Sequence, residues 1–240
     1  FVDLFQVKYF VQALNNTLII SFYQMAFGFF VPVFIAIFLN ELRLIIYSRV
    51  IQSIIYLPHF LSWVIIGGLF ATILSPSSGL VNGVLGWFGI DPIFFMADKA
   101  WFRSVLVFTQ IWKEAGWGSI IYLAALSGVD PSLHEAAKVD GANKFQLAWH
   151  VDLPSIRPTI VTLLILSCGG ILGVGFEKAF LMQNSLNLSA SEVISTYVYK
   201  SGLLQSQYSF SAAVGLFNSV INLTLLLTVN KLAKKFGQSG

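Results

Sequence analysis

Long apolar stretches alternate with shorter polar ones along this chain of 240 residues. A helix that spans the hydrocarbon core of a bilayer needs about 20 mostly apolar residues. Five stretches meet this condition, at 14–39, 51–74, 101–125, 159–181 and 210–229. Polar stretches lie between them, at 75–100, 127–157 and 183–208, and we find no convincing internal repeat. The pattern predicts an all-α polytopic membrane protein that forms one transmembrane domain over residues 1–240.

The composition agrees with this class. Hydrophobic residues make up 56% of the chain and charged residues 10%, and the mean hydropathy is +0.77. A soluble protein carries about 25% charged residues. The net charge of +3 is small and spread out, which is not the footprint of a nucleic-acid-binding protein. The single cysteine, Cys168, lies within an apolar run and is interpreted as a small core residue.

The stretch 127–157 is predicted to be a helical hairpin that projects from the membrane. Asp130 is a good N-cap, and Pro131 occupies the first helical position, where its missing N–H does no harm. Gly141 ends the first helix because glycine adopts the left-handed cap conformation cheaply. A second helix is expected to end before Pro154, since a proline disfavours helix in the residue before it. An exposed hairpin of this shape indicates docking to another protein.

A motif with fixed spacing lies in this hairpin. Glu135-Ala136-Ala137 is followed after three residues by Gly141, after nine more by Val151, and after one more by Leu153-Pro154. This resembles the EAA loop of ABC importer permeases, with valine at 151 where isoleucine is usual. The segments Glu-Ala-Ala-Lys-Val-Asp-Gly-Ala-Asn at 135–143 and Leu-Pro-Ser-Ile-Arg-Pro at 153–158 resemble the carbohydrate branch of the family, and within it the oligosaccharide and polysaccharide permeases. The match is specific because several residue types recur at long, fixed spacing.

The resemblance covers nearly the whole chain and implies a permease subunit of an ATP-driven importer for an oligosaccharide or another carbohydrate. It implies that ATPase subunits hold the hairpin and move it, so that the spans alternate the access of a central cavity. The implied partners are a second, similar permease subunit, two cytoplasmic ATPase subunits and an external solute-binding protein, at the inner membrane of a bacterium. The residues implied to couple to the ATPase are Glu135, Ala136, Ala137, Asp140, Gly141, Val151, Leu153 and Pro154.

Neither catalysis nor cofactor binding is expected of this chain. It contains no G-x-x-x-x-G-K-[ST] sequence, so ATP and Mg²⁺ are expected on partner subunits. The three histidines are scattered and the cysteine is alone, which gives no metal-ligand spacing and no pair of nucleophile and base.

The basic residues predict the orientation in the membrane. With 127–157 in the cytoplasm, eight of the 14 basic residues lie on that side, five lie on the other and Lys113 falls within a span. The cytoplasmic eight are Arg43, Arg49, Lys138, Lys144, Arg157, Lys231, Lys234 and Lys235. This count places the C-terminus in the cytoplasm and Phe1 outside. Permeases of the resembled family usually begin with one more span, so we expect a sixth, N-terminal transmembrane helix to be missing here.

Both outer polar stretches are predicted to contain short helices. In 75–100, prolines and glycines prevent a span, and the apolar residues from Leu80 to Phe88 favour a helix at the membrane interface. That helix could be an interfacial plug or a contact surface for a substrate-delivery protein. In 183–208 a helix is expected around 192–199.

Polar residues inside the predicted spans are the candidates for a substrate passage. A charge at this depth faces the bundle interior or a wet cavity. We expect Lys113 to pair with Glu177 and Glu114 with Lys178, pairs that would either fix helix register or line the passage, with Trp117 as a platform for a sugar ring. The candidate passage residues are Gln110, Lys113, Glu114, Trp117, Glu177, Lys178, Asn218 and Asn222.

Three alternatives remain open. An ion-coupled secondary transporter would use Lys113, Glu114 and Glu177 as a relay, but it leaves the hairpin unexplained and no inverted repeat is present. A non-transporting scaffold would explain the packing glycines but not the intramembrane charges. An ABC permease for a solute other than a sugar would share every feature except the hairpin sequence that resembles the carbohydrate branch.

Overall fold

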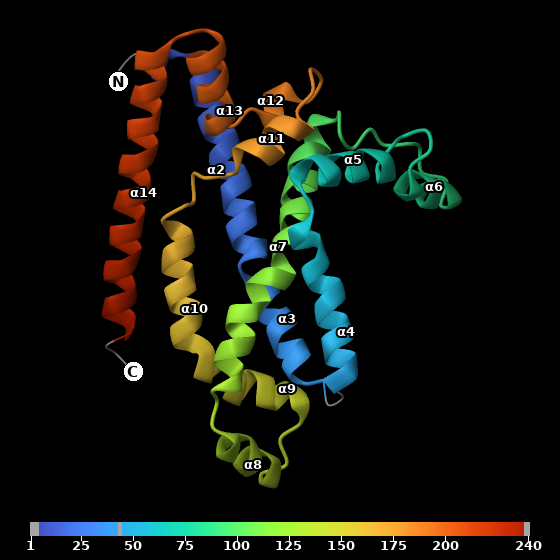
Figure 1. Ribbon diagram of the computed structural model, residues 1–240, viewed down its shortest axis with the longest axis vertical. Coiled ribbons are helices and arrows are strands. Elements are labelled where there is room, and N and C mark those ends of the chain that lie inside the picture. Colours follow the sequence, from blue (N-terminus) through green and yellow to red (C-terminus); the bar gives the residue numbers. More distant parts are fainter. Residues whose placement is uncertain (1–4, 43–44, 238–240) are drawn as a thin grey trace. The chain divides into compact units, whose positions relative to one another are not determined.

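Figure 1 shows the computed structural model, which describes residues 5–42 and 45–237. The described residues form helices and contain no strand, which confirms the predicted all-α class. In chain order the elements are α2 (Lys8–Gly28), α3 (Phe30–Asn40), α4 (Ile45–Tyr56), the 3₁₀ helix η1 (Leu57–Phe60), α5 (Trp63–Ile73), α6 (Leu80–Trp87), α7 (Lys99–Ser127), α8 (Pro131–Val139), α9 (Lys144–Leu147), the π-helix η2 (Ala148–Asp152), α10 (Leu153–Cys168), α11 (Phe176–Met182), α12 (Leu188–Ser191), α13 (Ile194–Tyr199), the π-helix η3 (Lys200–Leu204) and α14 (Tyr208–Gly237).

The chain divides into two compact units, each with a core of its own. Unit 1 comprises Phe1–Met25, Leu61–Gln110 and Gly169–Leu225. Unit 2 comprises Ala26–Phe60, Ile111–Cys168 and Leu226–Gly240. The expectation of one permease domain over 1–240 stays a prediction.

The core of unit 2 joins three helices. Val33 and Ala36 of α3 pack with Tyr122 and Leu126 of α7 and with Ile156 of α10, and all five are buried. The spacing of three residues on α3 and of four on α7 places each pair on one helix face. This core holds the start of α10, the helix that follows the hairpin.

The core of unit 1 contains Phe10 of α2, Ile194 of α13 and Val214 of α14. Beside it, the buried Asn16 of α2 acts as a polar anchor. Its amide nitrogen donates to the carbonyls of Ser189 and Glu192 at 3.0 and 2.9 Å. The same side chain accepts a hydrogen bond from Arg103 at 2.8 Å. Asn16 therefore ties α2 to α7 and to the segment before α13.

Helices able to cross a membrane are present among the described residues. Three stretches are long and apolar enough: Lys8–Asn40, Lys144–Cys168 and Tyr208–Lys235. A fourth candidate is the pair Ile46–Phe60 and Trp63–Ile73. The third predicted span coincides with the 29-residue helix α7, whose mean hydropathy is lowered by Lys113 and Glu114. The membrane-spanning character is confirmed, while five spans and a sixth missing helix stay predictions.

The second predicted span, 51–74, is wrong as a continuous helix. The helix is broken between residues 60 and 63. Pro58 lies in the 3₁₀ turn η1, and the side chain of Ser62 then caps α5 by accepting the N–H of Ile65. A proline followed by a new N-cap ends one helix and starts another, because each supplies a local alternative to the α-helical hydrogen bond.

The fourth predicted span, 159–181, has the wrong bounds. The helix ends at Cys168, and α11 starts only at Phe176 after a break that contains Gly169, Gly170, Gly173 and Gly175. Gly175 has φ +94°, a conformation that favours glycine. The glycine-rich stretch that was predicted to lie within this span instead interrupts the helix.

The helix boundary predicted before Pro154 is also wrong. The chain remains helical from Lys144 to Cys168, passing through the π-helix η2 and through both Pro154 and Pro158. In η2 the N–H of Leu153 bonds the carbonyl of Ala148, five residues earlier. This wider turn absorbs the missing N–H and the bulk of the proline ring, so the helix continues.

The two short helices predicted within 75–100 and 183–208 are confirmed as helices. α6 covers Leu80–Trp87, and the buried Asn82 side chain fixes the stretch around it through bonds to Leu74, Ser75 and Ile93. α13 covers Ile194–Tyr199 within the predicted 192–199.

Candidate functional site

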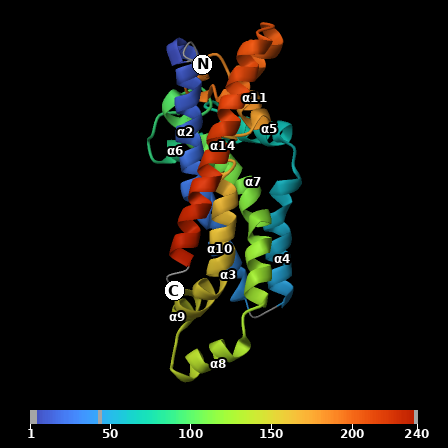
Figure 2. The ribbon, with the colours of Figure 1, turned by 90° about the vertical axis from the view of Figure 1, so that its left-hand side faces the viewer.

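The hairpin in unit 2 consists of α8, a turn and α9, and Figure 2 shows it as the connection that leaves α7 and returns through α9. Asp130 caps α8 as predicted, because its carboxylate accepts the N–H of Ser132 at 2.9 Å. The backbone and side-chain hydrogen bonds from Ser132 hold the pKa of the Asp130 carboxyl below its ordinary value. Pro131 occupies the first turn of the helix, also as predicted.

The turn after α8 is closed by backbone hydrogen bonds. The N–H of Gly141 donates to the carbonyl of Lys138 at 3.1 Å, and that of Ala142 donates to Ala137 at 2.9 Å. Gly141 has φ +81°, as expected for the left-handed residue that follows a helix. Asp140 is the C-cap. The predicted stop at Asp140-Gly141 is therefore confirmed.

The start of α9 contains a signal that the sequence analysis missed. The side chain of Asn143 accepts the N–H of Gln146 at 2.9 Å, and the side chain of Gln146 accepts the N–H of Asn143 at 2.8 Å. This is a capping box, in which two orphan N–H groups at a helix start are satisfied reciprocally. An Asn followed three residues later by Gln was visible in the sequence.

The hairpin exposes both the motif and several large apolar side chains. Glu135 and Ala136 are exposed, and Ala137 is half-buried. Val139 and Phe145 are 88% and 87% exposed, and Trp149 and Leu133 are exposed as well. A hollow of about 240 Å³ lies beside them, lined by Ala137, Asp140, Gly141, Ala142, Gln146, His150 and Val151. Exposed apolar patches of this kind mark interaction surfaces.

The end of the motif is attached to the core of unit 2. Leu153 packs against the cluster around Ile156, while Val151 is half-buried and Pro154 is exposed. The motif residues thus divide in two: Glu135 and Ala136 face outward on α8, and Leu153 fastens the hairpin to the helix that enters the core.

The polar residues of α7 that belong to unit 2 meet a residue that the sequence analysis did not select, His59. Its Nδ1 lies 2.9 Å from Oε2 of Glu114, and the Lys113 Nζ donates to its backbone carbonyl at 2.6 Å. The imidazole stacks on the Trp117 indole with centroids 4.5 Å apart and an interplanar angle of 2°. Glu114 is therefore paired with a histidine 55 positions away, which no local pattern indicates.

This cluster changes what Trp117 can offer. His59 covers one face of the indole, and Phe60 meets it at 83°. Trp117 remains 44% exposed. Lys113 is buried, and its bond to the carbonyl of His59 fastens α7 to η1 just before the break in the second predicted span.

The remaining candidate passage residues belong to unit 1. The buried Lys178 donates to Oε1 of Gln110 at 2.8 Å, and its Nζ lies 5.9 Å from the centroid of the Trp63 ring. Glu177 is exposed in the first turn of α11. The pairs Lys113–Glu177 and Glu114–Lys178 would join residues of different units and stay predictions.

The two asparagines of the last predicted span both lie on α14. The side chain of Asn222 accepts the N–H of Leu172 at 3.4 Å and so holds the segment that interrupts the fourth predicted span. The Oδ1 atom of Asn218 is buried and has no hydrogen-bond partner within residues 5–42 and 45–237. Asn222 thus has a structural contact, whereas the Oδ1 atom of Asn218 is an acceptor without a donor in the described residues.

Lys113→Ala is expected to lower the melting temperature of the purified protein. The change removes the buried donor to the His59 carbonyl and is expected to lower the free energy of unfolding by about 1–3 kcal/mol. Lys113→Met, which keeps the apolar stem, is expected to lower the melting temperature by less. The melting temperature is measured by heating the purified protein and detecting the remaining folded fraction by size-exclusion chromatography. An unchanged melting temperature combined with lost uptake would contradict this and favour a passage-lining role.

The family profile described as "Binding-protein-dependent transport system inner membrane component" matches residues 28–238. The chain belongs to this family. It is a membrane-spanning transport permease, and the family is one of permeases, not of enzymes.

The permease is similar in sequence to two proteins from Bacillus subtilis (strain 168). The polygalacturonan/rhamnogalacturonan transport system permease protein YteP is 44% identical over 240 residues, covering 100% of this chain and 75% of the relative. The arabinooligosaccharides transport system permease protein AraP is 29% identical over 232 residues, covering 96% and 74%.

The permease also resembles solved structures. A chain of a bacterial alginate ABC transporter, crystallised in complex with an alginate pentasaccharide-bound periplasmic protein, aligns with a TM-score of 0.94 at 42% identity. That alignment covers 100% of this chain and 83% of the other. An amino acid ABC transporter aligns with a TM-score of 0.53 at 19% identity, which shows a shared fold alone.

Proposed function

We propose that this chain is a permease subunit of an ATP-driven ABC importer for an oligosaccharide, which an extracytoplasmic solute-binding protein delivers. The observation that carries the proposal is the exposed hairpin at 127–157, with Glu135 and Ala136 outward on α8 and Gly141 at its turn, in a chain that belongs to a binding-protein-dependent family. Membership of this family argues against an ion-coupled transporter and against a scaffold.

The proposed cargo rests on the relatives. YteP is a polygalacturonan/rhamnogalacturonan permease, AraP is an arabinooligosaccharide permease, and the alginate transporter imports an acidic polysaccharide. These substrates are all carbohydrates, whereas the amino acid transporter shares only the fold. The hairpin sequence, which resembles that of the carbohydrate branch, also supports a carbohydrate as the cargo.

The proposed coupling follows from the surface of the hairpin. An ATPase subunit would hold α8 in a groove, with Ala136 and Ala137 permitting close approach and the apolar Val139 and Phe145 providing area to bury. This chain carries no phosphate-binding loop, so ATP and Mg²⁺ would be bound by two ATPase subunits. Closure of those subunits would displace the hairpin as a rigid body and alternate the access of the passage. A second permease subunit would complete that passage.

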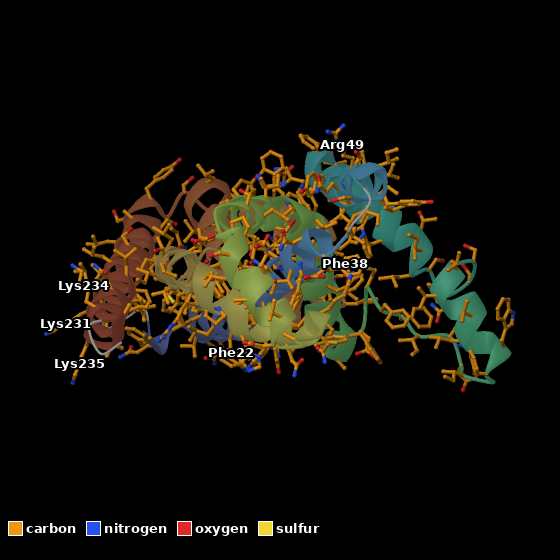
Figure 3. All side chains as sticks on the ribbon, turned by 90° about the horizontal axis from the view of Figure 1, so that it is seen from below. Phe22, Phe38, Arg49, Lys231, Lys234 and Lys235 are labelled. Atoms are coloured by element: carbon orange, nitrogen blue, oxygen red, sulfur yellow. The ribbon has the colours of Figure 1, made fainter. Side chains whose placement is uncertain are left out.

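The proposed orientation places the hairpin and the C-terminus in the cytoplasm. Figure 3 shows Lys231, Lys234 and Lys235 at the C-terminal end of α14, with Lys234 and Lys235 in its last turn. Basic residues collect on the cytoplasmic side of membrane proteins. Arg49 is exposed at the start of α4 and counts toward the same side. Phe1 and Arg43, which the predicted orientation also uses, lie outside the described residues.

A purification and reconstitution experiment tests the proposal. A tagged chain, expressed with the genes that flank its own, is expected to copurify with an ATPase and a second permease. In liposomes the complex is expected to hydrolyse ATP faster when an oligogalacturonide-loaded binding protein is added outside. Accumulation of a labelled oligosaccharide that requires ATP would agree with the proposal. Uptake driven by a proton gradient, in liposomes that contain this chain alone, would overturn it.

A further inference from the structure

A buried carboxylate lies where the hairpin returns to the core of unit 2. The Asp152 side chain is 0% exposed and belongs to the π-helix η2, directly before Leu153-Pro154. Its Oδ1 atom lies 2.9 Å from Nε2 of His134, and its Oδ2 atom is buried without a hydrogen-bond partner in the part of the chain that the structure describes. An ionised carboxylate accepts only, so His134 donates. Burying such a charge is unfavourable unless it is paired, and His134 is the partner present.

His134 comes from the coupling helix α8, one position before Glu135. The imidazole side chain is 21% exposed, so it lies on the inner side of α8, whereas Glu135 and Ala136 are exposed. A cavity of about 560 Å³ lies beside it, and the other charged groups that line the cavity are Glu41, Lys138 and Lys144. Glu41 and Lys144 pair with each other at 3.3 Å.

The rest of α8 is weakly attached. It contains no buried residue, and Gly128 and Gly141 lie just beyond its ends. Within residues 5–42 and 45–237, the hydrogen bond from His134 to Asp152 is the one side-chain bond that joins α8 to another helix. A short helix without buried apolar contacts can pivot on flexible ends unless a directional bond fixes it, and bonds to a charged acceptor are strong and directional.

We infer that His134 is a positioning residue, and that its bond to Asp152 is the strut that passes a displacement of α8 to α10. The inference rests on the proposed function, because it assigns a role within the coupling of ATP hydrolysis to transport. The ATPase would push on the outer face of α8. The strut on the inner face would then move η2 and, through Leu153, the start of α10, instead of letting α8 tilt alone.

The test uses the full complex reconstituted in liposomes and reads two rates, ATP hydrolysis and uptake of a labelled oligogalacturonide. Because His134→Ala strands a buried carboxylate and can prevent folding, the decisive variant is the double replacement His134→Ala with Asp152→Ala, which removes the charge as well. We expect it to assemble and to hydrolyse ATP. Its uptake is expected to fall about 5- to 150-fold, the factor that corresponds to typical coupling free energies between two sites. The ATP used per sugar is then expected to rise by the same factor.

Two further variants distinguish loss of the hydrogen bond to Asp152 from the general effect of shortening a side chain. His134→Gln, whose amide nitrogen can donate to Asp152, is expected to restore most of the coupling. Ser53→Ala is the control, because Ser53 also belongs to unit 2 but lies on α4, outside the hairpin, where it is exposed and donates to the Arg49 carbonyl of its own helix. It is expected to keep the wild-type ratio of ATP to sugar.

The outcomes are distinct. A double variant that transports with the wild-type ratio would overturn the strut, and so would a His134→Gln variant as uncoupled as the double one. If the wild-type chain copurifies with no ATPase, the proposed function itself fails, and this is seen before any variant is measured.

Discussion

Replacing Gly141 by proline is expected to abolish sugar uptake while the chain still inserts into the membrane. Gly141 has φ +81°, and its N–H donates to the Lys138 carbonyl. Proline fixes φ near −65° and has no N–H, so it loses both the conformation and the bond, at about 3 kcal/mol or more. The turn between α8 and α9 would open, and α8 would no longer be presented to an ATPase. ATP-dependent uptake by the reconstituted complex, together with ATPase copurification, measures the effect.

Graded substitutions and a matched control make this prediction specific. A Cβ atom at Gly141 would meet nothing within 4 Å, so only the backbone conformation opposes a side chain there. Gly141→Asn is therefore expected to retain more uptake than Gly141→Ala, since asparagine tolerates the left-handed region better. Gly89→Pro is the control, because Gly89 has φ +70° and donates to Gly86, but it lies after α6. Wild-type uptake by Gly141→Pro would refute the role of the turn.

Replacing Gly116 by alanine is expected to destabilise unit 2 strongly. A Cβ atom on Gly116 of α7 would lie 2.2 Å from the backbone oxygen of Ile55 and 2.5 Å from its Cγ2 atom. The obstacle is the backbone of α4, so α7 and α4 would have to separate. Overpacking a core costs about 1–3 kcal/mol where side chains can yield, and we expect the upper end of that range or more here.

The measurement is the melting temperature of the purified protein in detergent, with Gly68→Ala as the matched control. Gly68 also lies within a helix, α5, and a Cβ atom there would meet nothing within 4 Å. Gly68→Ala is expected to be neutral or stabilising, because alanine favours helix over glycine by about 1 kcal/mol. A Gly116→Ala protein as stable as the Gly68→Ala protein would show that the two helices do not meet as closely as the structure indicates.

Features that depend on neighbouring residues were predicted from the sequence. Asp130 capping α8, the left-handed Gly141 and the short helices α6 and α13 follow from hydrogen bonds and conformations that reach only a few positions along the chain. The capping box of Asn143 and Gln146 belongs to the same class and was available to the same reasoning. Local chemistry fixes these elements whatever the rest of the protein does.

The predictions failed where two local signals competed. Pro154 was expected to end a helix, but a π-helical turn carries the helix past it. The glycines after Cys168 lie within the predicted span 159–181, but they interrupt the helix. Glycine and proline have several low-energy uses in membrane helices, and the neighbouring segments decide which one is realised.

The sequence by itself determined the class of this protein, its family and the position of the hairpin between α7 and α10. These follow from apolar length, from local caps and from a motif whose spacing is read along the chain. The tertiary structure alone decided that Glu114 meets His59 and that Asp152 meets His134. Both contacts pair a histidine with a carboxylate from another element, 55 and 18 positions away. Burial makes a partner necessary for Asp152, whereas the Glu114–His59 pair is partly exposed. In both cases the packing of helices chooses the partner, and no periodicity in the sequence encodes that choice.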